Sequence, residues 1–263
     1  MVEDFIVDAH THTGYPGVFF TPEQAKGTLP AVMDRLNIRF AVCTSQDLLY
    51  GVDKDTLDRE QALYEESNGR IFFLGIFDPR RDEESLRFLR AATKSSGFAG
   101  LKIHPSIHGI PASDPSYEPA WRFADEHHLP ILTHSWSVSD YNPVQRLSTP
   151  GQFEPMIEKF PHVPFVLAHA GGRGSGRHEA IRLACDYPNV FLDFAGDIFC
   201  YGLIESLVAA VPPEKILFGS DYPWIDPRCH LTRVLVAEIG ADVKRKILRE
   251  NALRVYRLGG SHG

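Results

Sequence analysis

The sequence predicts an α/β protein, a single (β/α)8 TIM barrel with an extra C-terminal helix. The chain has 263 residues, close to the roughly 250 residues that are usual for one such barrel. Short apolar runs recur along it, and each is followed by a longer amphipathic stretch. Eight such pairs match a closed barrel better than a doubly wound open sheet, which usually has about five or six strands.

Eight apolar segments of strand length are the expected strands of the barrel. Most are nearly continuous apolar runs, which is typical of parallel strands that are buried on both faces. In chain order they are Phe5–Ala9, Ile38–Thr44, Ile71–Phe77, Ala99–Ile103, Pro130–Thr133, Pro164–Ala168, Val190–Phe194 and Lys215–Gly219.

The segments between these strands have the amphipathic pattern of helices that cover a barrel. In the first of them, Pro22–Leu36, Thr21 can cap the helix and Pro22 takes its first position. The others are Asp55–Ser67, Glu83–Ser95, Tyr117–His128, Gln152–Phe160, Arg177–Asp186, Gly202–Val211, Leu231–Ile239 and a final Asp242–Tyr256. Because no linker interrupts the pattern, we expect one barrel domain over residues 1–258 and a flexible tail over residues 259–263.

Composition restricts the classes of partner. The net charge of −7, without a basic block, argues against a nucleic-acid surface, which needs clustered Lys and Arg. No apolar run approaches the ~20 residues of a membrane span, and the N-terminus lacks the features of a signal peptide. The four cysteines, Cys43, Cys185, Cys200 and Cys229, are scattered. We therefore expect reduced thiols, a cytoplasmic protein and a small-molecule substrate.

Polar residues of the metal-ligand and acid–base types follow the expected strands at their C-terminal ends, where barrels carry their active sites. They lie in Asp8–His12, Lys102–His104, Thr133–His134, Ala168–Gly172, Asp193 and Gly219–Asp221. Since the ends of barrel strands meet at one face, we expect these side chains to converge on one mouth.

His10 and His12 have the spacing of a paired metal site. Residues two apart point to the same side of a strand, so both rings can reach one cation at about 2.0–2.1 Å. Alone, this pair fits a solvated loop better, and His134 or His169 alone could be a core histidine. Asp221 alone could cap the next helix. Together they supply the mixed histidine and carboxylate ligands of a catalytic zinc, iron or manganese site.

The order of motifs over the whole chain resembles the amidohydrolase superfamily, specifically its amidohydrolase-related branch. This branch includes aminocarboxymuconate-semialdehyde decarboxylase, resorcylate decarboxylases and lactone hydrolases of pyrone dicarboxylate. The resemblance is carried by Asp-Ala-His-Thr-His at 8–12, Gly-Leu-Lys-Ile-His-Pro at 100–105, Leu-Thr-His-Ser-Trp at 132–136, Leu-Ala-His-Ala-Gly-Gly at 167–172, Phe-Gly-Ser-Asp-Tyr-Pro-Trp at 218–224 and Glu-Asn-Ala-Leu-Arg-Val-Tyr at 250–256.

The resemblance implies a role for each matching residue. His10, His12 and His134 would ligate a divalent metal, with Asp221 as a further ligand and the catalytic proton acceptor. His169 would act beside the metal, stabilising a substrate oxygen or binding a second ion. One ion is favoured over two, and zinc is favoured over manganese or iron. The resemblance also makes a homodimer an expectation.

Lys102 and His104 are expected to bind substrate or support the site. In some members of the superfamily a carboxylated lysine at the end of strand four bridges two metals, and Lys102 is the alternative for that role. Arg173 could bind a substrate carboxylate or be a solvated loop residue. Trp136, Tyr222 and Trp224 lie in segments that follow strands and could line a pocket for a ring or a planar acid.

Three functions remain open at this stage. The first is hydrolysis of an amide, ester or lactone bond in a small carboxylated or cyclic substrate, by a metal-activated water with Asp221 as proton shuttle. The second is non-oxidative decarboxylation or hydration of a small aromatic or unsaturated carboxylic acid at the same site. The third is a barrel that binds metal or ligand without catalysis, which the full set of functional groups disfavours.

Overall fold

The computed structural model describes residues 5–14 and 29–259 and contains one eight-stranded sheet. The strands are β1 (Ile6–Thr11), β2 (Ile38–Cys43), β3 (Ile71–Ile76), β4 (Phe98–Ile103), β5 (Ile131–Thr133), β6 (Phe165–Leu167), β7 (Val190–Asp193) and β8 (Ile216–Leu217). They pair in parallel in sequence order. This confirms the TIM barrel that the sequence predicts.

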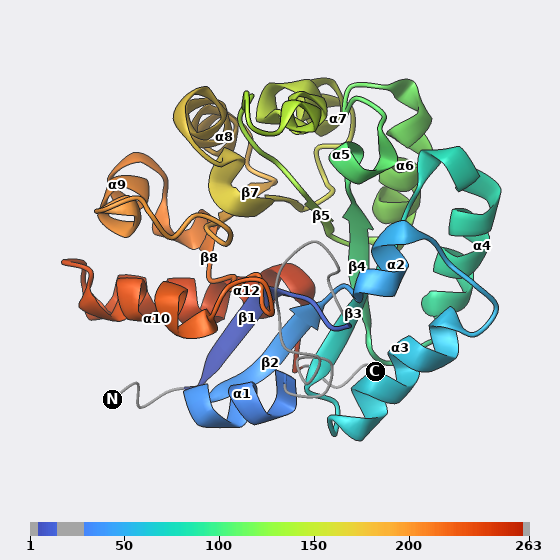
Figure 1. Ribbon diagram of the computed structural model, residues 1–263, viewed down its shortest axis with the longest axis horizontal. Coiled ribbons are helices and arrows are strands. Elements are labelled where there is room, and N and C mark those ends of the chain that lie inside the picture. The colour runs from blue at the N-terminus through green and yellow to red at the C-terminus, as the bar shows by residue number, and fades with distance from the viewer. Residues whose placement is uncertain (1–4, 15–28, 260–263) are drawn as a thin grey trace.

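Helices follow the strands and surround them (Figure 1). The α-helices are α1 (Leu29–Leu36), α2 (Gln46–Tyr50), α3 (Thr56–Glu66), α4 (Asp82–Ala92), α5 (Pro105–His108), α6 (Glu118–His127), α7 (Glu154–Lys159), α8 (Gly174–Asp186), α9 (Leu203–Ala210), α10 (Pro227–Val236), α11 (Ala241–Arg245) and α12 (Asn251–Tyr256). A π-helical turn, η8 (Lys246–Glu250), joins α11 to α12. Short 3-10 turns include η4 (Pro143–Ser148) and η6 (Ala168–Gly171).

The barrel closes through the segment that follows the short strand β8. The amide of Ala9 donates to the carbonyl of Phe218, and the amide of Asp221 donates to the carbonyl of His10, both at 2.9 Å. A parallel bridge between Thr11 and Tyr222 continues this pairing. The closure therefore brings Asp221 directly beside the end of β1.

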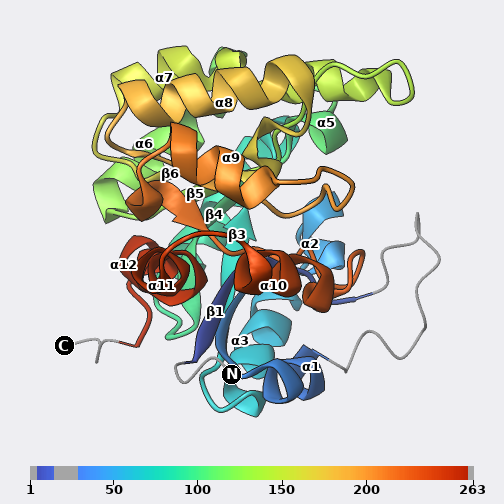
Figure 2. The ribbon, with the colours of Figure 1, turned by 90° about the vertical axis from the view of Figure 1, so that its left-hand side faces the viewer.

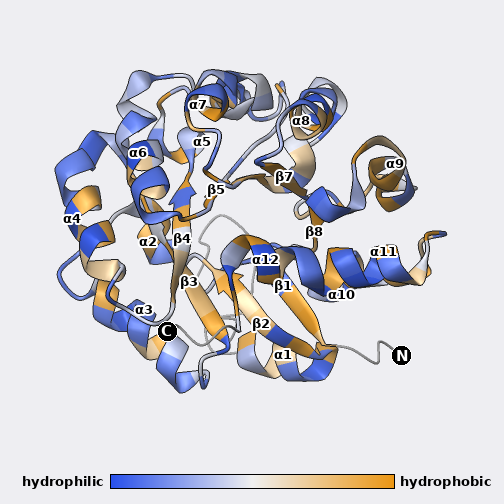
Figure 3. Cartoon of the chain, turned by 180° about the vertical axis from the view of Figure 1, so that it is seen from behind, coloured by the Kyte–Doolittle hydropathy of each residue, from blue (hydrophilic) through white to orange (hydrophobic). Residues whose placement is uncertain are grey.

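Burial follows the pattern expected for parallel strands. Every residue of β1, β3, β5, β6 and β8 is buried, and the strands are the most hydrophobic part of the chain (Figure 3). Most of the surrounding helices carry many hydrophilic residues, whereas α9 is mainly hydrophobic (Figure 3). The barrel interior is therefore a packed core, and functional groups can gather only at its ends.

The expected elements agree with the structure to within a few residues at their ends. The short helices α2 and α5, both in loops at the C-terminal ends of strands, were not expected from the sequence.

In Figure 2, α7 and α8 run next to each other, as they do in Figure 1. The first half of the helix expected at Pro22–Leu36, and the tail after Gly259, fall outside the described residues. In the described part, no helix is long and apolar enough to span a bilayer, and the four cysteines are free thiols.

Candidate metal centre

His10, His12 and Asp221 form a buried cluster at the C-terminal end of the barrel. One ligand atom from each lies within 4.8 Å of the other two. His12 Nε2 lies 3.3 Å from Asp221 Oδ1, and His10 Nε2 lies 3.7 Å from the same oxygen. Alternation along β1 places both imidazoles on one side of the strand, as the His-x-His spacing predicts. All three side chains are almost completely buried.

Hydrogen bonds on the far side of each ring fix the orientation of these two histidines. His10 Nδ1 lies 3.0 Å from Asp193 Oδ2, and His12 Nδ1 lies 2.8 Å from the carbonyl oxygen of Thr44. Both partners are acceptors, so each Nδ1 carries the hydrogen and each Nε2 keeps a lone pair. Metal-binding histidines are held in the same way by an acceptor behind the ring.

This arrangement fits a cation. Asp221 Oδ1 is buried and, among the described residues, receives no hydrogen bond. It faces Nε2 of His12 and of His10, and all three atoms present lone pairs to the same small space. Three acceptors that converge repel one another unless positive charge lies near them. Lys102 Nζ lies 3.2 Å from one of the three, His10 Nε2, and a cation between all three would offset the remaining repulsion. The donor set, two imidazole nitrogens and a carboxylate oxygen, suits zinc, manganese or iron.

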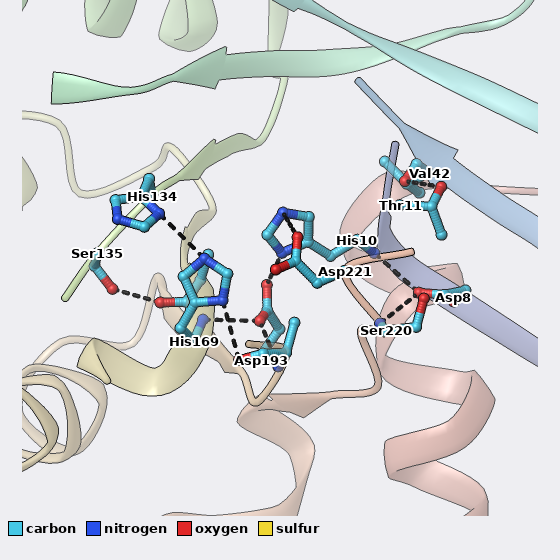
Figure 4. Close-up of polar contacts among 12 residues, drawn as sticks. Asp8, His10, Thr11, Val42, His134, Ser135, His169, Asp193, Ser220 and Asp221 are labelled. Carbon is cyan, nitrogen blue, oxygen red and sulfur yellow. Dashed lines mark hydrogen bonds and ion pairs between the residues drawn. The ribbon is translucent and has the colours of Figure 1, made fainter. Parts of the chain in front are cut away.

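His134 and His169 lie side by side next to this cluster. His169 Nε2 is 3.1 Å from His134 Nδ1, and the ring centroids of His169 and His10 are 5.2 Å apart. His134 is not part of the three-residue cluster, and His169 lies between it and His10 (Figure 4). His169 Nδ1 lies 3.0 Å from the carbonyl oxygen of Ala195, which leaves its Nε2 as an acceptor.

Lys102 and His104 extend the site along the end of β4. Lys102 Nζ is buried 3.2 Å from His10 Nε2. The ring of His104 stacks on His134 with centroids 4.3 Å apart, while its Nδ1 accepts from the amide of Ile107. Lys102 thus places a nitrogen directly beside the cluster, whereas His104 supports His134.

Burial sets the ionisation of most of these groups. It lowers the pKa of His169 to about 4 and the pKa of His10 far below its ordinary value, so both imidazoles are neutral and able to act as ligands. Burial also lowers the pKa of Lys102 to about 8, against the opposing pull of Asp193 and Asp221. For Asp221, burial raises the pKa, but interactions with the neighbouring imidazoles outweigh it and keep the group a carboxylate.

The backbone at the mouth is locally strained to bring these groups together. His169 has φ 62° and Asp221 has φ 60°, both in the left-handed region that non-glycine residues seldom adopt. Two glycines permit the close approach of neighbouring segments of the chain. A Cβ on Gly219 would lie 2.9 Å from Cβ of His10, and one on Gly196 would lie 2.6 Å from Nδ1 of His169.

The four other residues expected to bind substrate lie in different surroundings. Arg173 pairs with Asp197, its Nε 2.7 Å from Oδ2 and its second nitrogen 3.0 Å from Oδ1, so its fork is occupied. Trp136 packs edge-on against His169, with ring centroids 5.5 Å apart. The ring centroids of Trp224 and His12 are 4.8 Å apart. Tyr222 is 7% exposed and belongs to the hydrophobic core. Of these four residues, the two tryptophans are the ones whose rings contact histidines of the site.

Sequence reasoning singled out the histidines better than the groups that hold them. Asp193, which the sequence places only among the polar residues at strand ends, accepts hydrogen bonds from His10 Nδ1 and from the amides of His169 and Ala195. Asp8 accepts hydrogen bonds from the amide of His10 and from the amide of Ser220. Burial raises the pKa of Asp8 to about 7. The end of β7 gives a signal for Asp193, but only the fold shows its partners.

A barrel with a buried histidine and carboxylate cluster at the C-terminal ends of its strands defines a class of metal-dependent enzymes. A model of the amidohydrolase family matches residues 7–258. The chain therefore belongs to the amidohydrolase family, and it is a metal-dependent enzyme of that family. No protein in a search of curated sequences matches it.

Solved structures with the same fold include three decarboxylases. 2,6-Dihydroxybenzoate decarboxylase from Rhizobium has a TM-score of 0.75 at 13% identity, covering 97% of this chain and 99% of that one. 5-Carboxyvanillate decarboxylase from Sphingomonas paucimobilis has a TM-score of 0.71 at 14% identity, covering 96% and 99%. Dihydroxybenzoic acid decarboxylase from Polaromonas sp. JS666, with bound manganese and 2-nitroresorcinol, has a TM-score of 0.73 at 14% identity, covering 98% of each chain. At these identities the likeness concerns the fold.

Proposed function

We propose that this enzyme catalyses the non-oxidative decarboxylation of a small aromatic or unsaturated carboxylic acid. The observation that carries the proposal is Lys102, whose buried Nζ lies 3.2 Å from His10 Nε2. A buried ammonium group costs free energy unless anions offset it. Asp193 and Asp221 oppose the effect of burial on the pKa of Lys102 only in part, and a substrate carboxylate beside the metal would be a further anion. The decarboxylases with the same fold support the choice of substrate class.

We propose His10, His12, His134 and Asp221 as the residues that hold the metal. The first two and Asp221 already converge, and His134 Nδ1 would complete the set from beyond His169. A bound divalent ion would supply a Lewis acid that polarises the carboxylate or a neighbouring hydroxyl of the substrate. Zinc and manganese both suit these donors, and manganese is bound in one decarboxylase of the same fold.

The remaining chemistry falls to side chains of the chain itself. Lys102 would hold the carboxylate, and the lone pair of His169 Nε2 would accept a hydrogen bond from a substrate hydroxyl. When the bond between carbon and the carboxyl group breaks, the electron pair stays on the carbon. Asp221, a carboxylate at rest, would first take a proton from solvent and then pass it to that carbon, so that each turnover releases one CO2 and consumes one proton.

Hydrolysis of an amide, ester or lactone is the second candidate. It is favoured by Asp221, which is ionised at neutral pH and lies within reach of His12 and His10, where it could accept a proton from an attacking water. Lys102 and His169 would then stabilise the developing oxyanion. The two candidates use the same groups, so their products must separate them.

Product analysis with a panel of substrates tests the proposal. We expect the zinc- or manganese-loaded enzyme to release CO2 from a hydroxybenzoate or an unsaturated acid, with one deuterium from heavy water at the carbon that carried the carboxylate. Incorporation of oxygen-18 from labelled water into a ring-opened lactone, without CO2, would replace this proposal with hydrolysis.

Asp221→Asn tests the proton transfer separately from the fold. Asparagine tolerates the left-handed backbone at this position, so the variant should fold normally and retain part of its metal. We expect a fall in kcat of at least about 100-fold, since positioned proton transfer contributes about 10²–10⁴-fold. Asp186→Asn, at an exposed carboxylate on α8, is the matched control. A normal kcat in Asp221→Asn would exclude Asp221 as the proton carrier.

A further inference from the structure

Gln145 contacts His134 on the side of the ring that faces away from the other histidines. Gln145 Oε1 lies 2.7 Å from His134 Nε2, while His134 Nδ1 lies 3.1 Å from His169 Nε2. Gln145 belongs to η4, in the segment between β5 and α7. It stands outside every motif on which the family resemblance depends.

The contact determines which nitrogen of His134 carries the hydrogen. The amide oxygen of Gln145 can only accept, so Nε2 must donate to it. A neutral imidazole has a single ring hydrogen, so Nδ1 then keeps its lone pair and directs it toward His169. His169 Nε2 is also an acceptor, so the two lone pairs meet at 3.1 Å and a cation bound there would relieve their repulsion. His10 and His12 have the opposite arrangement, with Nδ1 bonded and Nε2 directed to the centre.

Two serines hold Gln145 in place. Ser106 Oγ lies 3.3 Å from Gln145 Oε1 and 2.6 Å from Ser148 Oγ. The amide of Ser106 also donates to Ser148 Oγ at 3.1 Å, and Ser148 is completely buried. These contacts join the segment after β4 to the segment after β5. The position of the Gln145 oxygen is thus set by two separate parts of the chain.

We propose that Gln145 is a positioning residue that makes His134 present Nδ1 to the metal centre. The inference rests on the proposed function only in taking His134 as a ligand. The oxygen of Gln145 orients the ring and increases the basicity of the opposite nitrogen, as acceptors behind metal-binding histidines do. Loss of such a partner typically costs about 10–100-fold in metal affinity.

Competition for Zn²⁺ with a chromophoric chelator tests this role in the full-length protein. We expect Gln145→Leu to bind Zn²⁺ about 10–100-fold more weakly than the wild type. Gln145→Glu keeps an acceptor in the same place and should restore affinity. Gln152→Leu is the matched control, because the amide of Gln152 lies in the same segment but bonds to the carbonyl of Arg146. It should bind Zn²⁺ like the wild type.

Two outcomes would overturn the proposal. Wild-type affinity in Gln145→Leu would show that the contact does not orient the ring. An equal loss in Gln145→Leu and Gln145→Glu would show that the amide nitrogen, not the oxygen, faces His134. Thermal unfolding of each variant identifies any that misfolds, and Gln145→Glu, which differs from glutamine by one atom, keeps the test decisive.

Nitrogen-15 spectra of the imidazole rings in the zinc-loaded protein give a direct second readout. We expect the His134 signal, identified by its loss in His134→Gln, to show a protonated Nε2 in the wild type and a mixture of tautomers in Gln145→Leu. A protonated Nδ1 in the wild type would contradict the inference. Because neither this readout nor zinc affinity depends on turnover, absence of CO2 release would count against the proposed function alone.

Discussion

At the scale of single residues, Asp193 organises the centre through the hydrogen bonds that it accepts from its neighbours. It accepts hydrogen bonds from His10 Nδ1 at 3.0 Å and from the amides of His169 at 2.9 Å and Ala195 at 3.0 Å. The side chain is completely buried at the end of β7. One carboxylate therefore fixes both the ring of a proposed ligand on β1 and the backbone that carries His169.

Asp193→Asn should weaken metal binding while leaving the fold intact. If the amide nitrogen of the new side chain faces His10 Nδ1, that ring must move its hydrogen to Nε2 and lose the lone pair that would bind the metal. We expect a loss of about 10–100-fold in Zn²⁺ affinity, measured by chelator competition. An unchanged affinity would mean that His10 is oriented by something other than this carboxylate.

The proposed ligands could be predicted from sequence because their spacing on one strand, and their positions at strand ends, are local properties. Asp193 and Gln145 could not be assigned, because an acceptor behind a histidine is defined only by contact across the barrel. Arg173 is a different case. Its chemistry suits a substrate carboxylate, but the fold places Asp197, 24 residues away along the chain, against its guanidinium.

At the scale of secondary-structure elements, helix α3 carries a buried acid on the face that packs on the barrel. Glu60 is 3% exposed, and Ser45, just before α2, donates to its Oε1 at 2.5 Å. Its other oxygen has no hydrogen-bond partner among the described residues. Burial raises the pKa of Glu60 to about 7, despite the bond from Ser45.

Glu60 should make stability fall as the pH rises. The carboxyl binds a proton more tightly when folded, with a pKa of about 7 against 4.5 for the ordinary group. The contribution of the protonated Glu60 carboxyl to the free energy of unfolding is therefore complete below about pH 4.5, and it is lost as the pH passes through 7. Glu60→Gln should remove up to about 3 kcal/mol of this pH dependence, measured by urea unfolding between pH 5 and 8. Glu66→Gln, at an exposed position on the same helix, should keep the wild-type dependence.

Elements with a distinct composition were the easier part of the fold to predict. The apolar runs gave all eight strands, since parallel strands buried on both faces have a distinct composition. The helices α2 and α5 span five and four residues, too short for a periodic pattern to identify. A π-helical turn, η8, lies inside the expected helix Asp242–Tyr256, and the sequence pattern did not indicate it.

At the scale of the whole molecule, closure of the barrel and assembly of the centre are the same event. β1 and the segment after β8 are hydrogen-bonded at the point where His10 and Asp221 meet. Farther along the chain, Asn251 on α12 donates to the carbonyls of Pro213 and Ile216 at 2.7 and 2.8 Å, holding β8 against the last helix. Residues from both ends of the chain thus meet at the proposed metal.

Metal removal should therefore lower global stability. A ligand that binds only the folded state stabilises it by about 2.7 kcal/mol at 100 times its Kd, and each kcal/mol shifts Tm by about 2–4 °C in a protein near this size. We expect Tm to fall on chelation and to recover when Zn²⁺ or Mn²⁺ is restored. His12→Ala should have the lower Tm throughout and respond little to chelator. An equal response in both proteins would place the stabilising metal elsewhere.

The left-handed backbone at His169 and Asp221 limits how this enzyme can evolve. Outside glycine, that conformation is adopted most readily by asparagine, aspartate and histidine, and of these only the last two are usual ligands or proton carriers. Mutation therefore has few acceptable alternatives at these two positions. More substitutions are acceptable in the loops around these two positions, because most loop residues have no such backbone requirement. New specificities in this lineage should consequently arise by change in the loops, while the centre is inherited almost unaltered.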